Sequence, residues 1–122
     1  NWCRGITVWN LALDQNGKPN IGPFPCGGLV TINSTTKEVT HSGQYFALAH
    51  FSKFIERGAK RIESTTLKNN QDISHVAFLN PSGERVLVLT NQGPKKTISI
   101  EEGKSVTEVT LAEASVTTLA WQ

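Results

Sequence analysis

The spacing of hydrophobic and polar positions changes its period once along the chain, near Gly58. Residues 5–13 form an almost continuous apolar run rich in β-forming residues, which is typical of a strand covered on both faces, as in a parallel sheet. Residues 14–28 contain four glycines and three prolines, and this composition predicts an irregular loop. A small hairpin is predicted next, with strands at residues 28–33 and 37–40.

One helix is predicted, over residues 43–57. Its apolar residues recur at helical spacing and form a single stripe, which consists of Tyr45, Leu48, Phe51 and Ile55. Ser42 can cap the first turn, because its hydroxyl oxygen can accept an otherwise unpaired backbone N–H. Arg57 suits the last turn, and Gly58 can close the helix in the left-handed conformation. The strand, the loop and the helix together make one βα unit.

The remaining sequence consists of short β-rich runs separated by turns that contain glycine or proline. Six such runs follow one another: KRIEST, ISHVAFLN, ERVLVLTN, KTISIE, SVTEVTLA and SVTTLAW. Apolar residues occupy both faces of the run at 84–91, which predicts a central strand. At 96–101 apolar and polar residues alternate, which predicts one solvent-exposed face. We expect an antiparallel meander folded into a small sandwich, and a protein that is mainly β with one α-helix.

Composition and charge argue against several classes of protein. The chain has 122 residues and a formal net charge of +2 without a long basic run, which disfavours a nucleic-acid or anionic-membrane surface. No apolar run approaches the ~18 residues of a membrane-spanning helix, and no signal peptide is visible. The chain begins at Asn1 and contains no methionine, so we expect it to be a piece excised from a longer protein.

No recognisable metal or catalytic motif is present, and no cofactor is predicted. The histidines do not have the spacing of a metal site and lie far apart at His41, His50 and His75. Cys3 and Cys26 are too few for a disulfide framework, and either one bridge or two unpaired thiols fit the sequence. Asn33 begins an N-glycosylation triplet, NST, which matters only if the chain is secreted from a eukaryote.

Two residues at the end of the first apolar run have competing interpretations. Asp14 stands where α/β barrels place their chemistry, but we favour a carboxylate that bonds to backbone N–H groups of its own loop. Trp9 can either pack in a core or stack its indole on the C–H face of a sugar ring, and the pattern alone favours the core. Trp2 and Trp121 are both predicted to be core residues, Trp121 beside Leu119 on one strand face.

Four stretches of the chain match a known family in the right order. They are WNLALDQNGKPN, HFSKFIERGAKRI, VAFLNPSGERVLVLTN and the closing TTLAW. Together they resemble the C-terminal part of the glucosylceramidase-like glycoside hydrolases of family 30. The resemblance spans essentially the whole chain, although the segment from Pro19 to Ser42 contributes little to it.

The resemblance implies a (β/α)8 barrel that packs against a β-sandwich. Residues 5–13 would be the eighth barrel strand, residues 14–42 the eighth βα loop and residues 43–57 the eighth helix. Residues 1–57 then form the last βα unit of the barrel, and residues 58–122 form an antiparallel β-sandwich. In the family a short N-terminal segment also contributes to the sandwich, so we expect an edge strand without its partner.

The resemblance also implies a site and a mechanism. The tryptophan of this motif lines the family's sugar pocket, so Trp9 is now favoured as a substrate-binding residue, with Asn10 supporting the strand end. Val8 stands where glucosylceramidases often carry an acid, which leaves the exact substrate open. Retaining hydrolysis needs an acid and a carboxylate roughly 5 Å apart, and the family carries them on barrel strands four and seven. Both lie upstream of Asn1, so no catalytic residue is expected here.

The resulting hypothesis is the C-terminal portion of a retaining β-glycosidase that hydrolyses β-glucosides such as glucosylceramide. The parent enzyme would belong to carbohydrate or sphingolipid metabolism and would be secreted or lysosomal. The isolated chain would be inactive, and its partner would be the remainder of the barrel. The alternative is a non-catalytic β-sandwich that binds carbohydrate or stabilises the barrel.

Overall fold

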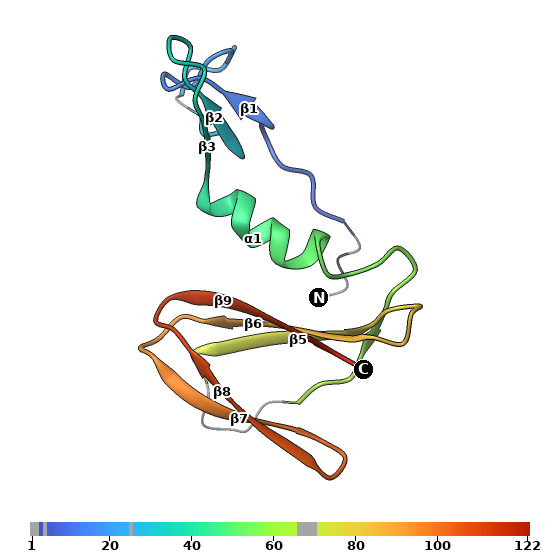
Figure 1. Ribbon diagram of the computed structural model, residues 1–122. Coiled ribbons are helices and arrows are strands. Elements are labelled where there is room, and N and C mark those ends of the chain that lie inside the picture. The colour runs from blue at the N-terminus through green and yellow to red at the C-terminus, as the bar shows by residue number, and fades with distance from the viewer. Residues whose placement is uncertain (1–2, 4, 25, 66–70) are drawn as a thin grey trace. The chain divides into compact units, whose positions relative to one another are not determined.

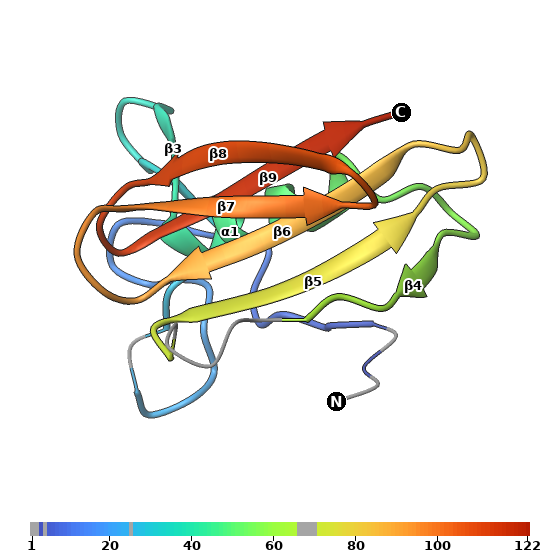
Figure 2. The same ribbon diagram turned by 90° about the horizontal axis from the view of Figure 1, so that it is seen from below.

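The computed structural model describes residues 3, 5–24, 26–65 and 71–122 (Figures 1 and 2). Trp2, which is predicted to be a core residue, lies outside the described residues. The chain divides into two compact units, residues 1–48 and residues 49–122, with the division inside the helix. Each unit has its own sheet structure and is described by itself.

The first unit contains a small three-stranded sheet. Its strands are β1 (Ala12–Leu13), β2 (Val30–Ile32) and β3 (Val39–His41), in the order β1-β2-β3. The β2–β3 pair confirms the predicted hairpin, and β1 runs parallel to β2. The strand predicted over residues 5–13 is wrong in extent, because only its last two residues are in β1. A strand extends only as far as a neighbouring strand pairs with it, and in the described residues β1 pairs with β2 alone, at Ala12 and Leu13.

The helix α1 spans Gly43–Ser52, so it is shorter than predicted. The Ser42 cap is confirmed, because the backbone N–H of Tyr45 donates to its hydroxyl oxygen over 3.2 Å. Arg57 and Gly58 lie beyond the helix and do not close it. Gly58 does have the positive φ expected of it, at 93°, but in the turn that precedes the next strand.

A buried asparagine explains the early end of the helix. Asn80 is 2% exposed, and its Oδ1 accepts the backbone N–H of Glu56 at 3.0 Å. Its Nδ2 donates to the carbonyl oxygen of Phe54 at 2.8 Å and to Glu84 Oε2 at 3.1 Å. These bonds satisfy backbone groups that another helical turn would have used. Tertiary contacts therefore override the helical pattern of residues 53–57.

The second unit is a β-sandwich, as predicted, with all six strands present. The strands are β4 (Lys60–Ile62), β5 (Ile73–Leu79), β6 (Arg85–Asn91), β7 (Lys96–Glu102), β8 (Ser105–Leu111) and β9 (Ser115–Trp121). One sheet has the order β4-β5-β6-β9 and the other is the β7–β8 hairpin, with every pair antiparallel. Figure 2 shows the hairpin lying over the four-stranded sheet.

The prediction of an antiparallel meander folded into a sandwich differs from the structure in the order of strand pairing. After β6 the chain leaves the first sheet, forms the β7–β8 hairpin and returns as β9, which pairs with β6 rather than with β8. A flat six-stranded meander would leave the apolar residues of one sheet face in water, whereas folding the hairpin over that face buries them.

The core lies on both sides of β6, which confirms that it is a central strand. Val86 and Val88 are 0% and 2% exposed on one face, and Leu87 and Leu89 are 7% and 4% exposed on the other. The leucine face packs against Leu111 and against the inward isoleucines of β7. The outward residues of β7 are exposed, as predicted for a strand with one face in solvent.

Truncating Leu111 to alanine tests this core. Leu111 is 1% exposed, so the variant loses buried apolar contacts and leaves a cavity, at a cost of about 2–5 kcal/mol in the free energy of unfolding. Val106 lies on the same strand and is 63% exposed, so Val106→Ala is the matched control and should change stability by less than about 0.5 kcal/mol. Urea denaturation measures both, and equal effects would contradict this description of the core.

Candidate functional site

Trp9 lies just before β1 with its side chain in solvent. It is 72% exposed, so packing within these residues does not account for it. The carbonyl oxygen of Asn10 accepts the backbone N–H of Leu29 at 3.0 Å, and that of Leu11 accepts the backbone N–H of Val30 at 3.0 Å. The peptide bond between Trp9 and Asn10 is cis. Backbone bonds therefore hold the segment that carries the indole, while the indole face stays open.

Asp14 organises the loop that follows β1. Its Oδ1 accepts the backbone N–H groups of Asn16 at 2.9 Å and of Lys18 at 2.8 Å. Its backbone N–H and carbonyl add bonds to Lys18 and Gly17. Gly17 has a φ of 72°, and a Cβ there would lie 2.8 Å from the carbonyl oxygen of Cys26, so only glycine fits. The structural interpretation of Asp14 is confirmed.

A second turn in the same loop depends on Asn20, which the sequence patterns alone did not single out. Its Oδ1 accepts the backbone N–H of Gly22 at 3.0 Å, and its Nδ2 donates to the carbonyl oxygen of Phe24 at 2.6 Å. An asparagine two residues before a glycine is the available signal, because its side chain commonly bonds to the backbone two residues on. The turn leaves Ile21 and Phe24 at 102% and 75% exposure.

Exposed apolar residues are concentrated in the first unit. Among the described residues, nine of the eleven large apolar side chains found exposed lie within residues 1–48, and they are Ile6, Trp9, Leu11, Ile21, Phe24, Ile32, Val39, Tyr45 and Phe46. The helix α1 likewise has no buried residue. Soluble proteins rarely leave so much apolar area uncovered unless it meets a partner or a ligand. Such a surface is typical of a site that a partner or a ligand covers.

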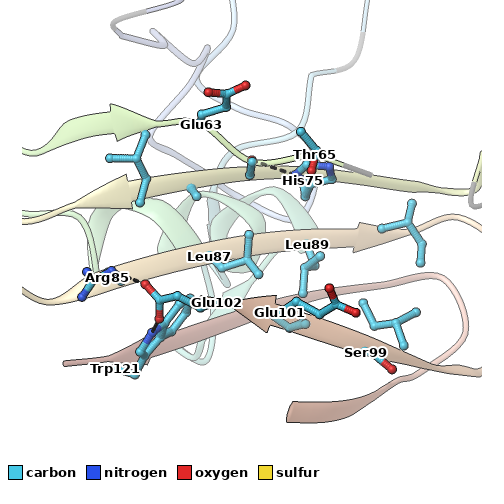
Figure 3. Close-up of a pocket in the computed structure, with 16 residues that line it drawn as sticks. Glu63, Thr65, His75, Arg85, Leu87, Leu89, Ser99, Glu101, Glu102 and Trp121 are labelled. Atoms are coloured by element: carbon cyan, nitrogen blue, oxygen red, sulfur yellow. Dashed lines mark hydrogen bonds and ion pairs between the residues drawn. The ribbon is translucent and has the colours of Figure 1, made fainter. Parts of the chain in front are cut away.

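The second unit contains a groove of about 550 Å³ between its two sheets (Figure 3). We call it the inter-sheet groove. Its floor is the apolar face of the four-stranded sheet and its wall is β7, with lining residues that include Ile62, Ala77, Leu87, Leu89, Ile98 and Ile100. In the described part of the chain β7 pairs with β8 only. The groove thus runs beside an edge strand whose outer hydrogen-bonding groups have no strand partner there.

A polar cluster closes one end of the inter-sheet groove. Glu102 Oε2 accepts the indole N–H of Trp121 at 2.6 Å, and Oε1 forms an ion pair with Arg85. Trp121 packs beside Leu119 against the core, as predicted, but it lines the groove rather than being buried. The Arg85 and Glu102 side chains are 39% and 44% exposed, so their pair contributes at most about 1 kcal/mol. The cluster positions the Trp121 indole, and both oxygens of the Glu102 carboxylate already have partners.

The three histidines serve separate local contacts. The His41 ring lies 4.2 Å from the Tyr45 ring, centroid to centroid. His50 Nδ1 lies 2.9 Å from the hydroxyl oxygen of Thr118, which ties α1 to β9 and agrees with a helix-packing role. His75 contacts a serine hydroxyl at the rim of the inter-sheet groove.

The thiols and acids form no cluster that suggests a bound ion. Cys3 and Cys26 are both unpaired, so of the two alternatives the structure has free thiols. Across residues 3, 5–24, 26–65 and 71–122, no group of three histidine, cysteine or acidic side chains could hold a metal. In the same residues no helix is long and apolar enough to cross a membrane.

Comparison with known proteins identifies the family. Residues 58–119 match the family model described as the glycosyl hydrolase family 30 beta sandwich domain. The chain is 36% identical to putative glucosylceramidase 2 of Caenorhabditis elegans over 95 residues, which cover 77% of this chain and 18% of that protein. It is 36% identical to endo-1,6-beta-D-glucanase BGN16.3 of Trichoderma harzianum over 97 residues, 75% of this chain and 19% of that protein.

Solved structures agree with this match. The endo-beta1,6-glucanase BT3312 superimposes with a TM-score of 0.89 at 34% identity, over 98% of this chain and 27% of that one. SrfJ from Salmonella typhimurium gives a TM-score of 0.86 at 27% identity, over 93% of this chain and 25% of that one. The chain therefore belongs to the glycoside hydrolase family 30 proteins, of which it contains the C-terminal β-sandwich domain. It spans about a fifth of the length of these curated relatives.

Replacing Asp14 by alanine tests the organisation of the loop beside Trp9. The variant loses two side-chain bonds to backbone N–H groups, each contributing about 0.5–1.5 kcal/mol, so amide exchange at Asn16 and at Lys18 should each rise about 2- to 10-fold. Asp14→Asn keeps an Oδ1 acceptor and is the control, with exchange close to that of the wild type. Hydrogen exchange followed by NMR measures this, and equal protection in Asp14→Ala would show that the carboxylate does not hold the loop.

Proposed function

We propose that this chain is the C-terminal portion of a retaining β-glycosidase that acts on β-glucosides. It supplies the last βα unit of the barrel (residues 1–57) and the sandwich that packs against it (residues 58–122). The observation that carries the proposal is the exposed apolar surface of the first unit, with Trp9 at 72% exposure beside β1. A severed barrel segment would show such a surface, because its apolar residues normally meet neighbouring strands and helices.

The reacting carboxylates belong, in this proposal, to polypeptide upstream of Asn1. One carboxylic acid protonates the leaving oxygen, and a carboxylate about 5 Å away attacks the anomeric carbon, after which water hydrolyses the glycosyl–enzyme intermediate. Trp9 contributes an apolar indole face for the C–H face of the sugar, and Asn10 supports the strand end through its backbone. The relatives are roughly five times as long as the matched segment, which leaves room for both carboxylates.

In the same proposal, the inter-sheet groove binds another segment of the parent enzyme. Its floor is apolar and its β7 wall has an unused strand edge in the described residues. An extended segment from elsewhere in the parent would pair with β7 by backbone hydrogen bonds and cover the floor with alternate side chains. The parent's N-terminal segment is the proposed occupant. This additional strand would complete the second sheet and stabilise the sandwich that packs against the barrel.

The substrate class is a β-linked glucoside. The relatives carry the names glucosylceramidase and endo-1,6-beta-D-glucanase. We therefore propose two candidate substrates, glucosylceramide and a β-1,6-glucan. Glucosylceramide would place the parent enzyme in sphingolipid metabolism. Val8, at a position where glucosylceramidases often carry an acid, keeps both forms open. Both substrates favour a secreted or lysosomal parent enzyme.

An activity assay on the chain and on its parent tests the proposal. The 122-residue chain alone should not turn over an aryl β-glucoside, whereas the parent with its upstream residues should, and a panel of glucosylceramide and β-1,6-gluco-oligosaccharides then ranks the substrates. Turnover by the chain alone that is lost on mutating one of its own carboxylates would refute the assignment.

A binding experiment on the isolated chain distinguishes the alternative function, a carbohydrate-binding sandwich, from the glycosidase proposal. Titration of the isolated chain with gluco-oligosaccharides, with Trp121→Ala as the variant, tests a carbohydrate-binding sandwich. Millimolar or tighter binding that disappears in the variant would favour that module, because Trp121 lines the inter-sheet groove. Binding that is absent from both proteins leaves the glycosidase proposal as the better account.

Trp9→Ala in the parent enzyme tests the sugar-stacking role. Loss of a side chain that is buried only when substrate binds removes about 1.5–3 kcal/mol of binding, which corresponds to about 10- to 100-fold in kcat/KM. Trp9→Phe keeps an apolar ring and should recover part of this loss. Steady-state kinetics on an aryl β-glucoside measures it, with unchanged thermal unfolding as the check on folding. Unaltered kcat/KM in the alanine variant would remove Trp9 from the site.

A further inference from the structure

The NST triplet at Asn33 is not used by the proposed function. It is the only Asn-X-Ser/Thr triplet without proline in the sequence, since Asn80 is followed by Pro81 and Ser82. It occupies the turn that joins β2 to β3, which lies at one end of the first unit (Figure 1). Such triplets arise by chance, so the surroundings of the amide are the evidence on whether the folded turn can carry a glycan.

The turn holds the Asn33 side chain in a defined orientation. Oδ1 accepts the backbone N–H groups of Thr35 at 2.9 Å and of Thr36 at 3.0 Å. The Asn33 backbone also bonds at both of its polar atoms, to Glu38 and Lys37. In the part of the chain that the structure describes, Nδ2 donates no hydrogen bond. The oxygen of the amide is therefore occupied, and the nitrogen is available for reaction.

The surroundings of the triplet are open. Asn33 is half-buried, and the residues that follow it, Ser34 to Lys37, are all exposed. The Thr35 hydroxyl, which the acceptor triplet requires, lies among these exposed residues. Asn80 is the contrast within the same chain, because it is 2% exposed and its Nδ2 already donates to two oxygens.

We propose that Asn33 is an acceptor for N-linked glycosylation. The donor is an oligosaccharide joined through a diphosphate to a polyprenyl lipid. Nδ2 bonds to the anomeric carbon of the first sugar, and the bond between that carbon and the diphosphate oxygen breaks. The lipid diphosphate is the leaving group, and the amide proton passes to a base of the transferase. The reaction requires passage through a compartment that contains this donor, which a eukaryotic secretory host supplies.

The linkage preserves the turn. An N-linked amide keeps its carbonyl oxygen, so Oδ1 still accepts from Thr35 and Thr36 after the sugar is attached. The glycan projects from an exposed hairpin tip and displaces no buried contact. Glycosylated and unmodified chains should therefore have the same hydrogen-exchange protection in β2 and β3.

Secretion of the whole chain from yeast tests the site. The secreted protein is given a secretion leader and an added C-terminal Asn-Gly-Thr tag, which reports arrival in the glycosylating compartment. We expect two glycans per chain, one at the tag and one at Asn33, each removed by peptide-N-glycosidase and located by peptide mass spectrometry. Asn33→Asp keeps the Oδ1 acceptor but has no nucleophilic nitrogen, and Thr35→Val keeps the backbone N–H but has no hydroxyl. Both should show the tag glycan alone.

Two outcomes would overturn the proposal. One is a chain whose tag is glycosylated while Asn33 stays unmodified, which would mean that the turn hides the amide. The other is a glycan outside the tag that persists in Asn33→Asp, which would place it elsewhere. Thr35→Ser retains the hydroxyl and should keep the glycan, so its loss there would also contradict this assignment.

Discussion

The burial of β6 on both faces is the constraint on which the second unit depends. Its four apolar residues alternate between the two sides of the sheet, and each is less than a tenth exposed. A strand of this kind must be central and needs a layer on each side. The β7–β8 hairpin forms the layer over the leucine face, while on the valine side Thr118, the partner of Val88, bonds to His50 of α1. The interrupted meander follows from this need.

The chain covers its apolar sheet faces only in part. A two-stranded hairpin is narrower than the four-stranded sheet beneath it, so the inter-sheet groove stays open beside β7. The first unit is more extreme, because most of its large apolar residues are exposed and its parallel pairing is two residues long. Both features point the same way. Both agree with the proposal that further polypeptide covers these surfaces in the parent, and the chain spans about a fifth of the length of its relatives.

The sequence predicted what local pattern determines. Six strands, the β2–β3 hairpin, the Ser42 cap and the two-faced burial of β6 all follow from spacing and turn residues, and the structure confirms them. Distant partners decided the rest. The helix ends at Ser52 because Asn80, far along the chain, bonds to the backbone that leaves it. The strand predicted over residues 5–13 is short because β1 pairs with β2 at two residues only in the described part of the chain.

The two described tryptophans show why a site could not be assigned from residue type alone. Trp121 and Trp9 each belong to an apolar β-rich run, and pattern alone favours the core for both. Trp121 packs against a cluster that the chain supplies, and Glu102 fixes its indole N–H. Trp9 has no comparable contact among the described residues, yet the residues that follow it are held by backbone bonds at Asn10 and Leu11 and by the Asp14 loop. An exposed apolar ring beside a hydrogen-bonded backbone segment has less conformational entropy to lose on binding than a ring on a segment without such bonds. That difference in support and exposure, rather than the tryptophan itself, is the physical argument for the sugar contact that we propose at Trp9.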